Sequence, residues 1–98
     1  MNLVYDPRVV KFLDKLGNRD KSKIREYILL FEEHGFRLDT RYLKKIIKDV
    51  WEVRPGRVRL FLYVRNDRII VVHANYKKSQ KIVLKDLKLI EDRVKQYI

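Results

Sequence analysis

The stretch VWEVRPGRVRLFLYVRNDRIIVVHANY (50–76) decides the fold, because it reads as three β-strands separated by two turns. Apolar and polar residues alternate from its start to Pro55-Gly56, which marks the first turn. Alternation resumes over 58–65 and ends at Asn66-Asp67, a pair that suits a tight hairpin. The third run, 68–76, is nearly all apolar at its centre, so we expect a central strand covered on both faces.

Counting outward from a turn at Asn66-Asp67 predicts how the two long strands pair. The expected pairs are Arg65–Arg68, Tyr63–Ile70, Phe61–Val72 and Arg59–Ala74. One sheet face should then carry Arg59, Phe61, Tyr63, Ala74 and Tyr76, and the other Leu60, Leu62, Val64, Val71 and His73. We interpret Phe61 and Tyr63 as core residues under a helix. Arg59 is different, because an arginine inside a strand is costly to bury unless it meets an anion or water.

Two helices are predicted on the amino-terminal side of this stretch. Leu3–Tyr5 reads as a short first strand, and Asp6-Pro7 has the signature of a helix start, with Asp as N-cap. Apolar residues follow at helical spacing as far as Gly17. Asp20 is predicted to cap a second helix that ends at His34-Gly35. Its apolar face consists of Ile24, Tyr27, Ile28 and Phe31.

The remaining segments complete an α+β fold with the element order β-α-α-β-β-β-α. Leu43, Ile46 and Ile47 are interpreted as a short helical turn, and residues 83–94 as a final amphipathic helix. An antiparallel sheet of about four strands should carry the helical hairpin on one face and the last helix on the other face or at an edge. Ninety-eight residues suffice for a single domain, 1–98.

The charge of the chain points to a polyanion or an acidic protein as partner. There are 24 Lys+Arg against 13 Asp+Glu, a net charge of +11, and nearly all of the excess lies in residues 41–98. Cations next to aromatic rings are typical of RNA-binding surfaces. A solvated basic face without a ligand is the plainer alternative.

Composition also excludes several classes of protein. Without cysteine, and with two histidines, the chain offers no disulfide scaffold, no thiol nucleophile and no expected metal site or cofactor. Glu52 has no second carboxylate at strand spacing, so a glycosidase-like acid pair is not expected. No apolar run approaches the ~20 residues of a membrane span, and the amino terminus does not resemble a signal peptide. We therefore expect a cytoplasmic protein without a membrane partner.

Four stretches in order carry a family resemblance: WEVR (51–54), GRVRLFLY (56–63), IVVHA (70–74) and KKSQK (77–81). Together they are similar to the RelE/HigB toxin superfamily, most of all to its phage-derived HigB-like branch. The resemblance implies a RelE-like fold and the toxin of a type II toxin–antitoxin system. Such toxins enter the ribosomal A site and cleave mRNA by attack of a ribose 2′-OH on the adjacent phosphate. The implied partners are a cognate antitoxin and mRNA on the ribosome.

The resemblance also implies roles for individual residues. Arg59 matches the strand arginine that would grip the scissile phosphate, and one lysine after the last strand would protonate the leaving oxygen. No late tyrosine matches the family's carboxy-terminal tyrosine, so the general base stays open between Tyr76 and His73. The catalytic candidates are Arg59, Lys78 and Tyr76. The RNA-binding candidates are Arg54, Arg57, Lys77, Lys81, Lys44 and Lys45.

Two other functions remain open at this point. A ParE-like gyrase inhibitor would share the fold, although such relatives lack the basic catalytic set. A non-catalytic basic RNA-binding module of the same fold would bind RNA without cutting it. In the toxin interpretations an acidic antitoxin segment is expected to cover the basic face.

Overall fold

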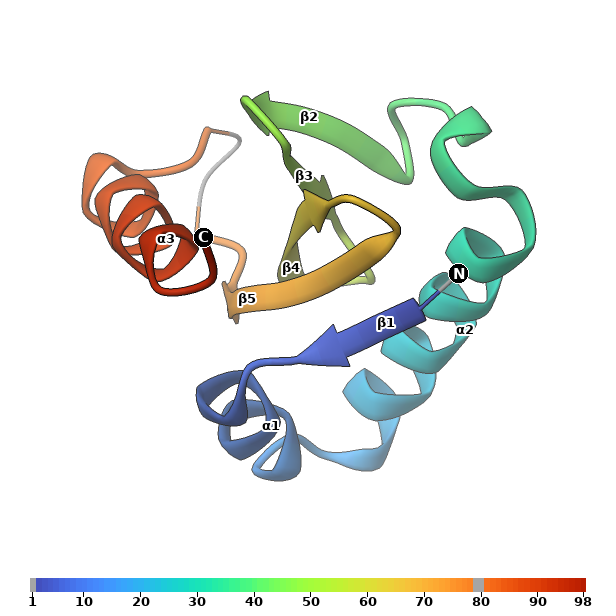
Figure 1. Ribbon diagram of the computed structural model, residues 1–98. Helices are drawn as coiled ribbons and strands as arrows, with labels where there is room; N and C mark the ends of the chain where they lie inside the picture. Colours follow the sequence, from blue (N-terminus) through green and yellow to red (C-terminus); the bar gives the residue numbers. More distant parts are fainter. Residues whose placement is uncertain (1, 79–80) are drawn as a thin grey trace.

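A mixed sheet lies at the centre of the computed structural model, which describes residues 2–78 and 81–98 (Figure 1). Ser79 and Gln80 of the KKSQK stretch therefore lie outside the described residues. In the described part the strand order is β1-β5-β4-β3-β2, with β1 parallel to β5 and all other neighbours antiparallel. The strands are β1 (Asn2–Tyr5), β2 (Leu43–Ile47), β3 (Val50–Val53), β4 (Val58–Arg65) and β5 (Arg68–Tyr76).

Helices cover both faces of this sheet (Figure 1). They are α1 (Pro7–Asp14), α2 (Asn18–His34) and α3 (Leu84–Lys95), with a 3-10 turn, η1 (Gly35–Arg37), after α2. The helical hairpin α1–α2 packs on one face and α3 on the other. The predicted α+β fold is thereby confirmed. Among the described residues, no helix is both long and apolar enough to span a bilayer.

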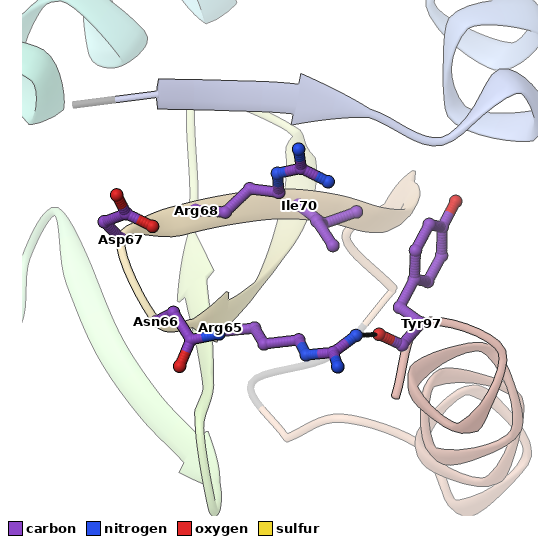
Figure 2. A pocket seen from close by; sticks show the side chains of 6 residues that line it. All are labelled: Arg65, Asn66, Asp67, Arg68, Ile70 and Tyr97. Atoms are coloured by element: carbon purple, nitrogen blue, oxygen red, sulfur yellow. Dashed lines mark hydrogen bonds between the residues drawn. The ribbon is translucent and has the colours of Figure 1, made fainter.

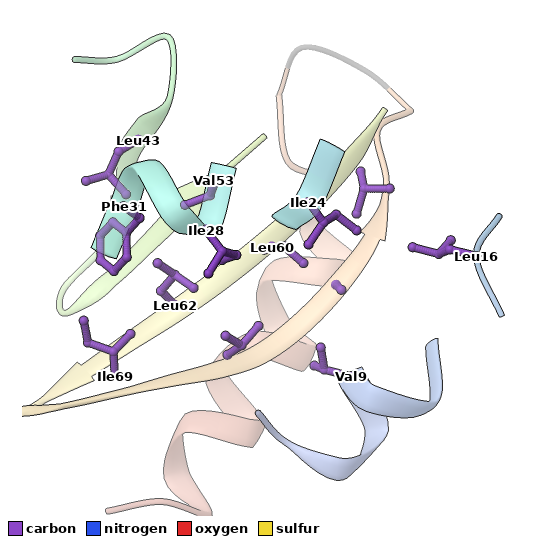
Figure 3. Close-up of a cluster of buried hydrophobic side chains, with 13 residues drawn as sticks. Val9, Leu16, Ile24, Ile28, Phe31, Leu43, Val53, Leu60, Leu62 and Ile69 are labelled. Atoms are coloured by element: carbon purple, nitrogen blue, oxygen red, sulfur yellow. The ribbon is translucent and has the colours of Figure 1, made fainter. Parts of the chain in front are cut away.

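Two apolar clusters hold the helices to the sheet. The larger one joins Ile24, Ile28 and Phe31 of α2 to the hairpin-side residues of the strands (Figure 3). On the other face Ile90 of α3, which is fully buried, packs with Phe61 and its neighbours. That cluster consists of Val50, Phe61, Tyr63, Ile70, Val72 and Ile90. The interpretation of Phe61 and Tyr63 as core residues under the last helix is confirmed.

The helix boundaries follow local chemistry, with one correction. Asp6 caps α1 through its side chain, which accepts from the backbone N–H of Arg8, and Pro7 is the first helical residue, as predicted. The second helix ends at His34, and Gly35 follows with a φ of 60°, a left-handed conformation that glycine adopts without strain. The predicted cap by Asp20 is wrong. Helix α2 begins at Asn18, and Asp20 instead binds Arg57.

Residues 43–47 form a strand, so the predicted helical turn is wrong. Strand β2 pairs with β3. This pairing satisfies backbone N–H and C=O groups of residues 43–47 that would bond within the segment if it were helical. A turn with Asp49 at a φ of 62° joins the two strands. Aspartate is one of the few residues that tolerates this conformation. The additional strand, β2, is therefore joined to β3 by a tight turn that lacks the usual Asn-Gly or Asp-Gly signal.

The predicted pairing of the long hairpin is right near the turn and wrong beyond it. Arg65 faces Arg68 and Tyr63 faces Ile70, as expected, but a β-bulge between Leu62 and Phe61 leaves one extra residue on β5. Beyond it Phe61 faces His73, Leu60 faces Ala74 and Arg59 faces Asn75. Because side chains alternate, the bulge moves His73 to the α3 face and Ala74 and Tyr76 to the hairpin face. The predicted faces of these three residues are therefore corrected.

The end of α3 is tied to the start of α1 by a buried carboxylate. Asp6 is 1% exposed and accepts hydrogen bonds from the Arg8 guanidinium, at 2.7 and 2.9 Å, and from the Tyr97 hydroxyl, at 2.5 Å. Arg8 also donates to Gln96. The hydrogen bonds from Arg8 hold the pKa of Asp6 well below its usual range. Asp6 thus stays ionised and joins the two ends of the domain.

Candidate functional site

Glu52 on β3 ion-pairs with two of the predicted arginines. Arg54 Nε lies 3.1 Å from Glu52 Oε1, and Arg59 Nε lies 3.2 Å from Glu52 Oε2. The side chains of Glu52 and Arg59 are 4% and 3% exposed, whereas that of Arg54 is 22% exposed. Arg59 was expected to meet an anion or water, and the anion it meets is a carboxylate of the protein itself. Arg54 is the more accessible of the two guanidinium groups.

The sheet register brings this acid–base cluster together. Glu52 lies opposite Phe61 of β4, and Arg59 is two residues from Phe61 on the same face. Diagonal neighbours on adjacent strands are within reach of long side chains. Arg54 follows β3 directly and is two residues from Glu52, so both arginines reach the same carboxylate. We call Glu52, Arg54 and Arg59 the arginine clamp.

A cavity of about 280 Å³ opens beside the clamp. Its lining consists of Lys44, Lys45, Ile46, Glu52, Lys81 and Ile82, and we call it the lysine pocket. Lys44 lies opposite Glu52 in the pairing of β2 with β3. The ammonium group of Lys45 lies 5.8 Å from the centre of the Trp51 ring. The pocket thus brings Lys44 and Lys81 next to the carboxylate that holds both arginines, whereas the ammonium group of Lys45, which also lines the pocket, is directed to the Trp51 ring on the hairpin face.

His73 extends this arrangement across the sheet. Lys44, Glu52, Phe61 and His73 are successive partners on four neighbouring strands, so they form one row on the α3 face. The His73 ring stacks on Phe61 with centroids 5.6 Å apart. Its Nε2 lies 3.5 Å from Asp86 Oδ1, and its Nδ1 lies 3.3 Å from the Arg93 guanidinium. Burial and Arg93 lower the pKa of His73, against a smaller opposing effect of Asp86.

The lowered pKa of His73 predicts a loss of stability in mild acid. Between its ordinary pKa of 6.5 and the lower pKa of the folded protein, the unfolded chain takes up a proton that the folded chain does not. Stability should therefore fall as the pH drops below 6.5, by at most about 1.4 kcal/mol per pH unit for this single group. Urea unfolding of wild type and His73→Gln at pH 7.0, 6.0 and 5.0 measures the difference in slope. His34→Gln, at an exposed site, is the matched control and should keep the wild-type slope. Identical slopes for wild type and His73→Gln would contradict this account.

Two other predicted residues lie on the opposite face. Tyr76 is 40% exposed and packs edge-on against Phe12 of α1, with ring centroids 5.3 Å apart. The Arg57 guanidinium lies 5.1 Å from the Tyr76 ring centre and 2.9 Å from the Asp20 carboxylate. These contacts place Tyr76 and Arg57 beside the helical hairpin, away from the face that carries the arginine clamp.

The structure consequently brings together some predicted site residues and separates others. Arg54 and Arg59 meet at Glu52, with Lys44, Lys45 and Lys81 at the adjoining pocket. Lys77 and Lys78 are exposed just after β5. The three catalytic candidates do not converge, because Arg59 is on the α3 face, Tyr76 is on the hairpin face and Lys78 is in the connection to α3.

A second cavity, of about 400 Å³, lies at the turn between β4 and β5 (Figure 2). Arg65 and Arg68 line it together with Tyr97, and Arg65 donates a hydrogen bond to the backbone carbonyl of Tyr97. It includes none of the predicted site residues. It also lies at the end of β4 remote from Arg59, so we do not assign it to the candidate site.

Sequence reasoning missed Glu52, Asp86 and Arg93 as site residues. A signal for Glu52 was available, because WEVR places Glu52 and Arg54 on one side of a strand. No local signal could reveal that Asp86 and Arg93 meet His73, since that contact depends on the bulge in β5. In the described part of the chain, no three His, Asp or Glu side chains are grouped so as to hold a metal ion.

Comparison with protein families gives a match over most of the chain. The family model described as phage derived protein Gp49-like (DUF891) matches residues 11–95. A search of curated proteins found no match to the chain. The matched range runs from within α1 to the last residue of α3, so it includes every residue of the arginine clamp and the lysine pocket.

Proposed function

The chain belongs to the phage-derived Gp49-like family, which is associated with the toxins of toxin–antitoxin systems, and from this premise we propose that it is a ribosome-dependent mRNA endonuclease. The observation that carries the proposal is the convergence of four cations on one site, Arg54, Arg59, Lys44 and Lys81. Two guanidinium groups meet at Glu52, and Lys44 and Lys81 line the adjoining pocket. Such a set is suited to an RNA backbone, where several phosphates must be bound at once.

The proposed reaction requires no cofactor. It depends on stabilising the negative charge that develops on the phosphoryl oxygens. The ribose 2′-oxygen attacks the adjacent phosphorus as its proton passes to a base, and the bond from phosphorus to the 5′-oxygen breaks. The leaving oxygen takes up a proton, which leaves a 2′,3′-cyclic phosphate and a 5′-hydroxyl. Negative charge builds up on the phosphoryl oxygens in between. Cations placed there stabilise the transition state, and losing one such group typically costs about 10²–10³ in rate.

Within this proposal the residues have distinct duties. Arg54 makes the outer phosphate contact, and Arg59 stabilises the scissile phosphate once the RNA is seated. Lys44 and Lys81 hold the neighbouring backbone, and Lys78 lies in the segment that would supply the general acid. His73 is the base candidate that shares a face with the arginine clamp, whereas Tyr76 does not.

A second candidate is a non-catalytic RNA-binding module of the same fold. The observation in its favour is that Arg59, Tyr76 and Lys78 do not converge, and that Arg59 is only 3% exposed. Both candidates would work in the cytoplasm, where mRNA and ribosomes meet, and the endonuclease would also present a basic face to an antitoxin. The partner we propose is an acidic antitoxin segment that covers Arg54 and the lysine pocket.

The decisive experiment is a reconstituted translation reaction with purified protein, programmed ribosomes and end-labelled mRNA, run beside naked mRNA. We expect cleavage on ribosomes only. The double variant Lys44→Gln/Lys81→Gln should cut at least about tenfold more slowly, because it removes two backbone contacts from the lysine pocket. The matched control is Lys11→Gln/Lys15→Gln, which removes the same charge from exposed positions at α1 and should cut like wild type.

Three other results would overturn the proposal. Cleavage of naked mRNA would identify a free ribonuclease. No cleavage in either reaction, with RNA binding that weakens steeply as salt rises, would favour the non-catalytic module. Inhibition of gyrase supercoiling without mRNA loss would favour the ParE-like function.

A further inference from the structure

Glu52 occupies the groups that an RNA phosphate would need. Each of its carboxylate oxygens lies near the Nε of one arginine, at 3.1 and 3.2 Å. Carboxylate and phosphate compete for guanidinium groups. The carboxylate is planar and the phosphate is tetrahedral, but both are oxyanions that accept charge-assisted hydrogen bonds from the guanidinium N–H groups. A phosphate that reaches Arg54 or Arg59 therefore meets a cation that already has an anion.

The position of Glu52 makes this competition strong. The carboxylate is 4% exposed, so water screens its attraction to the two arginines far less than it would at the surface. It also lines the lysine pocket, the same cavity through which a ligand would approach. Lys44, the opposite neighbour of Glu52 on β2, adds a third cation to the same carboxylate's surroundings. One buried anion thus offsets part of the positive charge of the site.

We propose that Glu52 is a specificity-determining residue: it is a built-in counter-ion that Arg54 and Arg59 must exchange for an RNA phosphate. This inference rests on the proposed function, because it takes RNA as the ligand of the site. In this role Glu52 discriminates between free RNA and RNA that the ribosome holds in place. Free RNA must displace the carboxylate with its own binding energy, whereas RNA positioned on the ribosome brings binding energy from elsewhere.

The test compares wild type with Glu52→Gln in binding to a ten-nucleotide single-stranded RNA. The RNA carries 2′-O-methyl groups, so that it binds but cannot be cut by its own 2′-oxygen. We expect the variant to bind at least about tenfold more tightly at low salt, because two guanidinium groups lose their internal anion. The logarithmic salt dependence should become steeper by about 0.7 to 1.4, the contribution of one or two additional phosphate contacts to a single strand. Glu33→Gln, at an exposed position of α2, removes the same charge and should bind like wild type.

A second measurement covers the case in which Glu52→Gln folds poorly. Loss of the carboxylate leaves Arg59 buried without this anion, so the melting temperature should fall, and the RNA should raise it more in the variant than in wild type. Glu52→Asp keeps the charge but is one methylene shorter, so it contacts the two arginines less well. Its gain in affinity should be smaller than that of Glu52→Gln.

The possible results separate this inference from the proposed function. Tighter binding by Glu52→Gln supports the exchange. Equal or weaker binding by Glu52→Gln, with binding that still depends on Lys44 and Lys81, overturns the role of Glu52 and leaves RNA binding intact. No binding by wild type or by either Glu52 variant overturns both. Tighter binding by Glu52→Gln without any cleavage on ribosomes upholds the exchange and rejects the endonuclease.

Discussion

Replacing Arg59 with methionine is expected to lower the free energy of unfolding by about 3–5 kcal/mol, the usual cost of removing one partner from a buried ion pair. Methionine keeps most of the side-chain length, so the loss comes from charge rather than from a large void. Glu52 would remain buried with Arg54 as its only partner in the clamp. A domain of this size typically has a total stability of about 5–15 kcal/mol, so a substantial part of it would be lost. Urea unfolding monitored at Trp51 measures the change.

A double-mutant cycle separates this charge effect from packing. The pair Glu52→Gln/Arg59→Met removes both charges and should be at least about 1 kcal/mol more stable than Arg59→Met alone. Arg41→Met is the control, because Arg41 and Asp39 form an ion pair that is 78% and 55% exposed. Exposed pairs contribute about 0–1 kcal/mol, so this change should be small. A double variant no more stable than Arg59→Met would show that the buried charge is not the cause.

The stability result governs how toxicity assays are interpreted. Arg59→Ala should relieve growth arrest in cells that express the protein, since it removes the proposed phosphate contact. An unfolded variant would relieve it as well. Growth assays therefore need the folded fraction of each variant, and the comparison with Lys44→Gln/Lys81→Gln is cleaner because those side chains are exposed. A folded Arg59→Ala protein with full toxicity would reject Arg59 as a site residue.

Substituting Asp6 with alanine is expected to destabilise the protein by about 2–4 kcal/mol. The change removes the N-cap of α1, typically worth about 1 kcal/mol, together with charged hydrogen bonds of about 1.5–3 kcal/mol. It also leaves the Tyr97 hydroxyl without its acceptor, so the end of α3 should loosen. For a domain of this size, such a loss corresponds to a fall in melting temperature of roughly 10 °C or more. Thermal unfolding and amide exchange near the end of α3 would detect the two effects.

Asp39 provides a closely matched control for Asp6. Both aspartates accept from the backbone N–H and the guanidinium of the arginine two residues later, but Asp39 is exposed. Asp39→Ala should therefore cost less than about 1 kcal/mol. A comparable loss in both variants would show that burial is not what gives Asp6 its effect.

Acid should lower the stability of the protein through the carboxylate of Asp6. Because Arg8 lowers the pKa of Asp6, its stabilising effect is present above the ordinary pKa of 3.8 and is lost as the pH falls toward the lower folded value. The stability of Asp6→Ala should accordingly depend less on pH than that of wild type below pH 4. Equal acid sensitivity of the two proteins would count against this assignment.

Much of the fold could be predicted because its signals are local. Alternation over 58–65, the Asn66-Asp67 turn and the Asp6-Pro7 helix start each depend on neighbours in sequence. The β2 strand could not be predicted, since a five-residue segment with two lysines among its apolar residues takes its conformation from the strand beside it. The bulge in β5, opposite Phe61 and Leu62, was equally invisible, and this one extra residue decides which face His73 and Tyr76 occupy.

The sequence by itself determined the α+β class, the basic character of the second half and the resemblance that predicted a toxin. These depend on composition, periodicity and the order of short motifs, all of which survive in an unfolded chain. Only the tertiary structure decided that Arg54 and Arg59 share the carboxylate of Glu52, and that Lys44 and Lys81 line the pocket beside it. The physical reason is that strand register and bulges, which form only when the sheet assembles, set the distances between charges from different strands.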